Sequence, residues 1–143
     1  MNKKINQHAL NEIFQNAHIA LQSISNLSPE IKDSDIKDEL LTEYEQYEGL
    51  ISDLSTYMEK NGFEREDIGV MKKAMLWGSI KMKTLTGVDK SKVADMMIKG
   101  ATMGITELTS LKNDGKMDSK TVEFLDKLLS IEEGSIQRLK AFL

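Results

Sequence analysis

Apolar residues recur along most of this chain at intervals of three and four, the spacing that places them on one face of an α-helix. No stretch alternates between apolar and polar residues over a useful length, so the pattern predicts no β-strand. Helices are expected over residues 7–26, 34–60, 67–85, 89–113 and 118–143. The sequence therefore predicts an all-α protein.

Turn and capping residues separate the expected helices. Pro29 marks a stop and restart, because proline is tolerated at a first helical position. Gly62, Gly87 and Gly115 follow the ends of helical stretches, where a C-terminal cap favours glycine, and Asp89 is expected to cap the start of the next helix. No linker or low-complexity stretch divides the chain, so residues 1–143 are expected to form one domain.

Composition narrows the class of protein. The 143 residues are 40% hydrophobic and 29% charged, which is ordinary for a globular domain and too apolar for disorder. Cysteine is absent, which rules out disulfides and a thiol nucleophile and suits a reducing cytoplasm, so we expect a cytoplasmic protein. Neither a secretory signal nor a membrane-spanning apolar run is evident. The net charge of −4 argues against a nucleic-acid partner.

Charge and methionine are unevenly distributed. Acidic residues predominate between positions 30 and 66, and lysines between 68 and 99, which fits either two neighbouring solvated faces or a complementary contact between subunits. Apolar side chains surround the 67–85 helix, among them Met71, Met75, Trp77 and Met82. They predict a methionine-rich core, a dimer interface or a ligand groove, and a membrane-surface helix fits less well. We expect a homo-oligomer.

The last expected helix places a carboxylate among apolar residues. Its stripe consists of Val122, Leu125, Leu129, Glu132, Ile136, Leu139 and Leu143. A carboxylate buried in a helical bundle costs several kcal/mol unless it is paired, protonated or bound to a cation. Glu132 is therefore expected to have a partner.

Other helices offer partners for Glu132. The stripe of the second helix is expected to consist of Leu40, Tyr44, Tyr47, Ile51, Leu54 and Met58, with Glu43 and Glu48 on opposite flanks. The hydroxyls of Tyr44, Tyr47 and Ser135 could form a buried polar layer with Glu132, and a metal ion could take their place. Glu107 falls on the apolar face of the fourth segment, whereas Glu12 is expected to face away from the stripe of the first helix.

One stretch carries a family resemblance. Trp77, Lys81, the Leu85–Gly87 turn and Asp89, followed by Gly100, are similar to a bacterial family of uncharacterised ferritin-like domains. The resemblance implies an antiparallel four-helix bundle with residues 67–85 as an additional helical crossover segment between two hairpins. A helix of that length spans about 28 Å, which is enough to return the chain to the other end of a bundle.

The metal ligands of ferritin-like proteins are largely missing. The di-metal members use a Glu from each of two helices and a Glu-x-x-His pair from each of the other two. Here the corresponding pairs are Tyr44-x-x-Tyr47 and Glu132-x-x-Ser135, and the first helix offers Ala17. We therefore predict that a complete di-metal site is absent.

Three functions remain open at this point. The preferred hypothesis is a ferritin-like bundle that has lost its di-metal site and acts as a binding or structural protein, without cofactor or catalytic residues and not as an enzyme. The alternative is an iron or manganese oxidoreductase or iron-handling protein with carboxylate ligands drawn from Glu132, Glu107, Glu48 and Glu43. A carrier of a small apolar ligand would instead need a cavity beside Gly78, Gly100 and Gly104.

Overall fold

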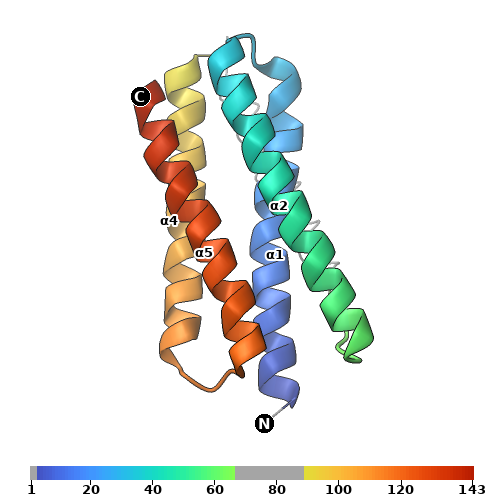
Figure 1. Ribbon diagram of the computed structural model, residues 1–143. Coiled ribbons are helices and arrows are strands. Elements are labelled where there is room, and N and C mark those ends of the chain that lie inside the picture. The colour runs from blue at the N-terminus through green and yellow to red at the C-terminus, as the bar shows by residue number, and fades with distance from the viewer. Residues whose placement is uncertain (1–2, 67–88) are drawn as a thin grey trace.

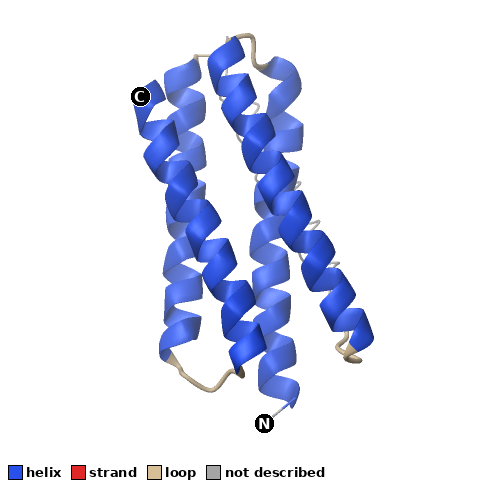
Figure 2. Ribbon diagram, in the orientation of Figure 1, coloured by secondary structure: helices blue, strands red, loops and turns tan. Residues whose placement is uncertain are grey.

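The computed structural model describes residues 3–66 and 89–143. Within these ranges the chain forms the α-helices α1 (Lys3–Leu27), α2 (Ser34–Lys60), α4 (Lys90–Asn113) and α5 (Ser119–Leu139), with short 3₁₀ helices at Ser28–Glu30 and Lys140–Phe142. The described residues contain no strand, and short loops join their helices (Figure 2). The all-α prediction is confirmed for this part of the chain.

The helix expected over residues 67–85 lies outside the described residues. The same holds for four side chains assigned to a ligand or interface surface, Met71, Met75, Trp77 and Met82.

The helices form two antiparallel hairpins, α1–α2 and α4–α5 (Figure 1). α1 and α5 run in one direction, and α2 and α4 run in the other. An ion pair of 3.8 Å between Lys90 and Asp33 places the start of α4 beside the start of α2. The backbone N–H of Asp118 donates to Asn6 Oδ1 at 2.9 Å, which places the start of α5 beside the start of α1. The chain therefore leaves α2 at one end of the bundle and enters α4 at the other.

Local capping explains where the described helices begin and end. Asp33, Asp89 and Asp118 each accept hydrogen bonds from backbone N–H groups of the turn that follows. Gly62 and Gly115 adopt positive φ angles of 69° and 67° just after α2 and α4, a conformation that disfavours other residues. The caps predicted at Asp89, Gly62 and Gly115 are confirmed. No helix of the described residues is long and apolar enough to cross a membrane.

The buried face of α2 differs from the predicted stripe. It consists of Ile36, Leu40, Glu43, Tyr47, Leu50, Leu54 and Met58. Glu43 was expected on a flank and is fully buried, while Tyr44 and Ile51 are only half-buried. That part of the prediction is wrong, because α5 supplies polar partners that allow a carboxyl to be buried there.

The buried face of α5 is also broader than the single stripe predicted from the sequence. It consists of Thr121, Phe124, Leu125, Leu128, Glu132, Ser135 and Leu139. The predicted burial of Leu125, Glu132 and Leu139 is confirmed, whereas Leu143 is exposed and the other stripe residues are half-buried. The reason is that α5 contacts α4, α2 and α1, and three neighbours cover more than a single stripe.

A buried amide attaches the loop after α2 to α1. Asn11 Nδ2 donates to the Glu64 carbonyl at 2.8 Å, and Asn11 Oδ1 accepts from the Glu66 N–H at 2.9 Å. The side chain of Gln7 accepts from the Glu64 N–H at 3.1 Å. These bonds satisfy backbone groups that no helix pairs.

Asn11→Ala is expected to lower the free energy of unfolding by about 1–2 kcal/mol, because it removes the part-buried hydrogen bonds of this loop to α1. Asn16→Ala is the matched control, since the Asn16 amide bonds only to the Glu12 carbonyl within α1. Urea denaturation of both variants measures the difference. Equal losses in the two variants would contradict a structural role for the attachment.

Candidate functional site

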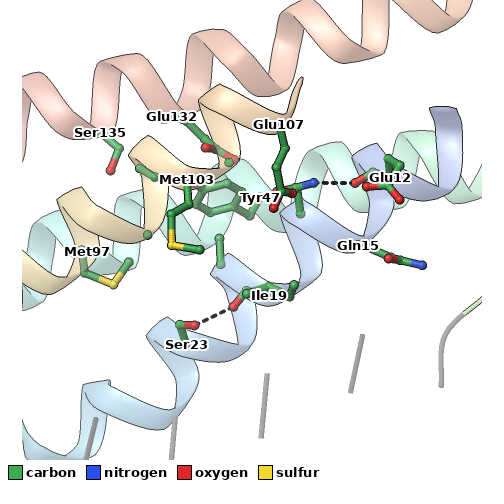
Figure 3. A pocket seen from close by; sticks show the side chains of 15 residues that line it. Glu12, Gln15, Ile19, Ser23, Tyr47, Met97, Met103, Glu107, Glu132 and Ser135 are labelled. Atoms are coloured by element: carbon green, nitrogen blue, oxygen red, sulfur yellow. Dashed lines mark hydrogen bonds between the residues drawn. The ribbon is translucent and has the colours of Figure 1, made fainter. Parts of the chain in front are cut away.

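A cavity of about 310 Å³ lies between α1 and α4 (Figure 3). The two helices supply its walls, and Tyr47 of α2 with Glu132 and Ser135 of α5 forms its inner end. Gly100 and Gly104 are among the α4 residues that line it. A cavity of the kind that a carrier of an apolar ligand would need is therefore present beside these two glycines, while Gly78 lies outside the described residues.

The walls of the cavity consist of apolar side chains and of polar side chains that already have hydrogen-bond partners nearby. Ile19, Ala20, Met97 and Met103 contribute apolar surface. Ser23 also lines the cavity, but its hydroxyl donates to the Ile19 carbonyl at 2.7 Å within α1 (Figure 3). Helical side chains that bond back in this way offer less to a ligand. The polar groups that remain for a ligand lie mainly at the inner end and at the mouth.

Glu132 is the most unusual group at the inner end. It is only 2% exposed, and its Oε2 atom has no hydrogen-bond partner among the residues that the structure describes. Burial, reinforced by the negative charge of Glu107, raises the pKa of Glu132 to about 8. The carboxyl is therefore mostly neutral at pH 7.

Gly104 makes room for this carboxyl. A Cβ atom built on Gly104 would overlap Glu132 Oε2 and lie 2.9 Å from Oε1. Glycine in the interior of a helix is unfavourable by roughly 0.5–1 kcal/mol relative to alanine. Its presence in α4 is explained by the close approach of the Glu132 side chain.

The partners expected for Glu132 are arranged differently. Ser135 donates to Glu43 Oε1 at 2.5 Å. Tyr47 is buried, and its pKa is raised well above the usual value by burial and then by the charges of Glu132 and Glu43. Tyr44 is only half-buried. The buried polar layer thus contains Tyr47 and Ser135 as predicted, and Glu43 belongs to it as well.

Glu43 belongs to a chain of polar contacts between α2 and α5. Burial and then the contact with Glu39 raise the pKa of Glu43 to about 8, although the Ser135 hydroxyl and the charge of Arg138 act to lower it. Both oxygens of Glu39 accept from Arg138 Nε, at 3.0 and 2.9 Å. Glu43 Oε2 accepts no hydrogen bond, and Glu39 offers only acceptors. The contact between the two carboxyls is therefore a hydrogen bond only when Glu43 carries the proton.

The four carboxylates assigned to a metal are not gathered at one point. Glu43 and Glu132 are buried, Glu107 lies at the mouth of the cavity, and Glu48 is exposed on α2. Over residues 3–66 and 89–143, no group of three or more His, Asp or Glu side chains could hold a metal ion.

Two groups of the site were missed from the sequence. Glu12 was expected to face away from the apolar stripe, but it lines the cavity opposite Glu107 (Figure 3). Arg138 lies among polar residues near the chain end, and no local pattern pairs it with Glu39. The surroundings of both side chains depend on how helices that are distant in sequence pack together.

Comparison with known proteins yields no match, whether with protein-family models, curated proteins or solved structures. The described residues define the class as an all-α helical bundle with a carboxyl-lined internal cavity.

Proposed function

We propose that this chain is a ferritin-like helical bundle without a di-metal site that acts as a binding protein, with the cavity between α1 and α4 as its ligand site. The ferritin-like assignment is supported by two antiparallel hairpins, of which the first ends with α2 at one end of the bundle and the second begins with α4 at the other end. The binding role is carried by one observation, the buried and unpartnered Glu132 carboxyl at the inner end of the cavity.

Stability alone does not account for the cavity. Protein interiors pack with few voids larger than a water molecule, and a cavity of about 310 Å³ lies at the lower end of the range for ligand pockets. Buried polar groups almost always have hydrogen-bond partners, and an unsatisfied one costs about 1–3 kcal/mol. A ligand that fills the cavity and contacts Glu132 would remove both costs.

The site favours binding over catalysis. Ser23 and Ser135 both line the cavity, but the Ser23 hydroxyl donates to the Ile19 carbonyl and the Ser135 hydroxyl donates to Glu43. Glu43 is mostly protonated at pH 7 because its pKa is raised to about 8, so it is a poor general base. His8 and His18 both lie on α1 and do not line the cavity.

The proposal predicts that a small apolar alcohol binds in the cavity. With 3,3-dimethylbutan-1-ol, we expect saturable shifts in the amide NMR signals of Gly100 and Gly104. Ala20→Leu should abolish them, because the larger side chain fills the cavity. Ala141→Leu is the matched control, since Ala141 is exposed and outside the cavity.

The absence of saturable shifts, or equal shifts in Ala20→Leu, would overturn the proposed site. Elemental analysis of protein prepared with iron and manganese tests the alternative function. Stoichiometric metal that is lost in Glu132→Gln would favour the metal-binding alternative over the binding function proposed here.

A further inference from the structure

The charge of the cavity has one sign. Glu12, Glu107 and Glu132 line it, and among its described lining residues there is no Lys or Arg. Glu12 and Glu107 lie on facing helices near one end of the cavity, and both also line the next surface depression along α1 and α4 (Figure 3). Among the lining residues that the structure describes, an anionic ligand would therefore meet carboxylates at the mouth and no Lys or Arg.

The inner end adds two features that suit a cation. Glu132 Oε2 is buried and has no hydrogen-bond partner among the described residues, so a positively charged group beside it would stabilise the ionised carboxylate. The Tyr47 side chain lies at the same inner end (Figure 3). An aromatic face attracts an ammonium group by about 0.5–2 kcal/mol, most strongly where water is excluded.

The walls define the rest of the ligand. Met97, Met103 and Ile19 present flexible or aliphatic surface, which contacts hydrocarbon well and tolerates variation in shape. The volume of about 310 Å³ suits a small molecule and is too small for a folded segment of protein.

From these observations we infer that the ligand of the cavity is a small organic cation, whose ammonium group lies against Glu132 and Tyr47 and whose apolar part lies against the methionines. This inference rests on the proposed binding function and specifies its ligand class. Glu12 and Glu107 contribute by attracting the cation to the mouth, an effect that salt screens.

The test compares two probes of the same shape. Choline and 3,3-dimethylbutan-1-ol differ in that a quaternary nitrogen replaces a carbon, and hence in one positive charge. Isothermal titration calorimetry of the full chain is expected to show that choline binds at least about tenfold more tightly, which corresponds to about 1.4 kcal/mol. In Glu132→Gln the ratio of the two affinities should fall severalfold, to the smaller preference that Tyr47, Glu12 and Glu107 provide.

Glu133→Gln is the matched control. It removes the same charge from the adjacent, exposed position of α5 and should retain the preference for choline. Circular dichroism confirms that each variant is folded. If Glu132→Gln does not fold, Glu107→Gln provides the second test, and it should weaken choline binding more at low salt than at high salt while leaving the alcohol unaffected.

The outcomes separate the inference from the proposed function. A third probe of similar shape, 3,3-dimethylbutanoate, carries a negative charge. Equal binding of choline and the alcohol, or tighter binding of 3,3-dimethylbutanoate than of choline, overturns the inference that the ligand is a cation. Either result leaves the proposed binding cavity in place. Binding of none of the three overturns both. A choline preference that is undiminished in folded Glu132→Gln overturns the role of Glu132.

Discussion

Glu132→Gln is expected to unfold with nearly the same free energy as the unaltered protein at pH 5 and to be more stable by about 2 kcal/mol or more at pH 8. The pKa of Glu132 is about 8 in the folded protein and has its usual value of 4.5 in the unfolded chain. Between these two values the unfolded chain loses the proton while the folded protein keeps it. The free energy of unfolding therefore falls as the pH rises through this window, by about 1.4 kcal/mol per pH unit for one group.

Glutamine removes this dependence because it resembles the protonated carboxyl and does not ionise. Glu43→Gln is expected to act in the same direction, since burial raises the pKa of Glu43 to about 8 as well. A glutamine at this position can also accept from Ser135 and donate to Glu39. Urea denaturation at intervals between pH 5 and pH 8 measures the slopes. Glu133→Gln, at an exposed position, should keep the slope of the unaltered protein.

A parallel pH dependence in Glu132→Gln and in the unaltered protein would show that the Glu132 carboxyl ionises as freely in the folded state as in the unfolded chain. The assignment of Glu132 as a residue buried at the inner end of the cavity would then be wrong.

Gly104→Ala is expected not to stabilise the protein, although Gly49→Ala should stabilise it by about 0.5–1 kcal/mol. Both glycines lie within helices, where alanine is favoured. A Cβ atom on Gly49 would have no neighbour within 4 Å, whereas a Cβ on Gly104 would overlap the Glu132 carboxyl. That carboxyl would have to move into the cavity, so Gly104→Ala is also expected to weaken ligand binding.

A double-mutant cycle isolates the contact between these two residues. In a Glu132→Ala background, Gly104→Ala should regain the stabilisation of about 1 kcal/mol that a helical alanine normally gives. Thermal unfolding of the two single variants and the double variant gives the coupling energy. If Gly104→Ala stabilises the unaltered protein as much as Gly49→Ala does, the Glu132 carboxyl does not lie against Gly104.

The helices were largely predictable because their signals are local. The apolar spacing and the caps at Asp89, Gly62 and Gly115 involve residues a few positions apart, and the structure places the described helix ends there. The exact buried face was harder to predict. Glu43 replaces Tyr44 on the buried face of α2, because its partner Ser135 comes from a helix distant in sequence.

The candidate site was predictable only in part. The burial of Glu132 followed from the apolar stripe of its helix, whereas a cavity beside Gly100 and Gly104 was a requirement of only one of the hypotheses, the carrier of an apolar ligand. Glu12 and Asn11 could not be predicted in the same way, because their roles depend on a facing helix and on a distant loop. The homo-oligomer, the cytoplasmic location and the Met71–Met82 surface remain predictions.

The pKa of Glu132 in the ligand-free protein tests the account most directly. Carbon-13 NMR of glutamate-labelled protein follows each side-chain carboxyl during a pH titration, and Glu132→Gln identifies the signal by its loss. The account predicts a midpoint of about 8. A midpoint near the usual value of 4.5 would contradict a buried, unpartnered carboxyl at the cavity.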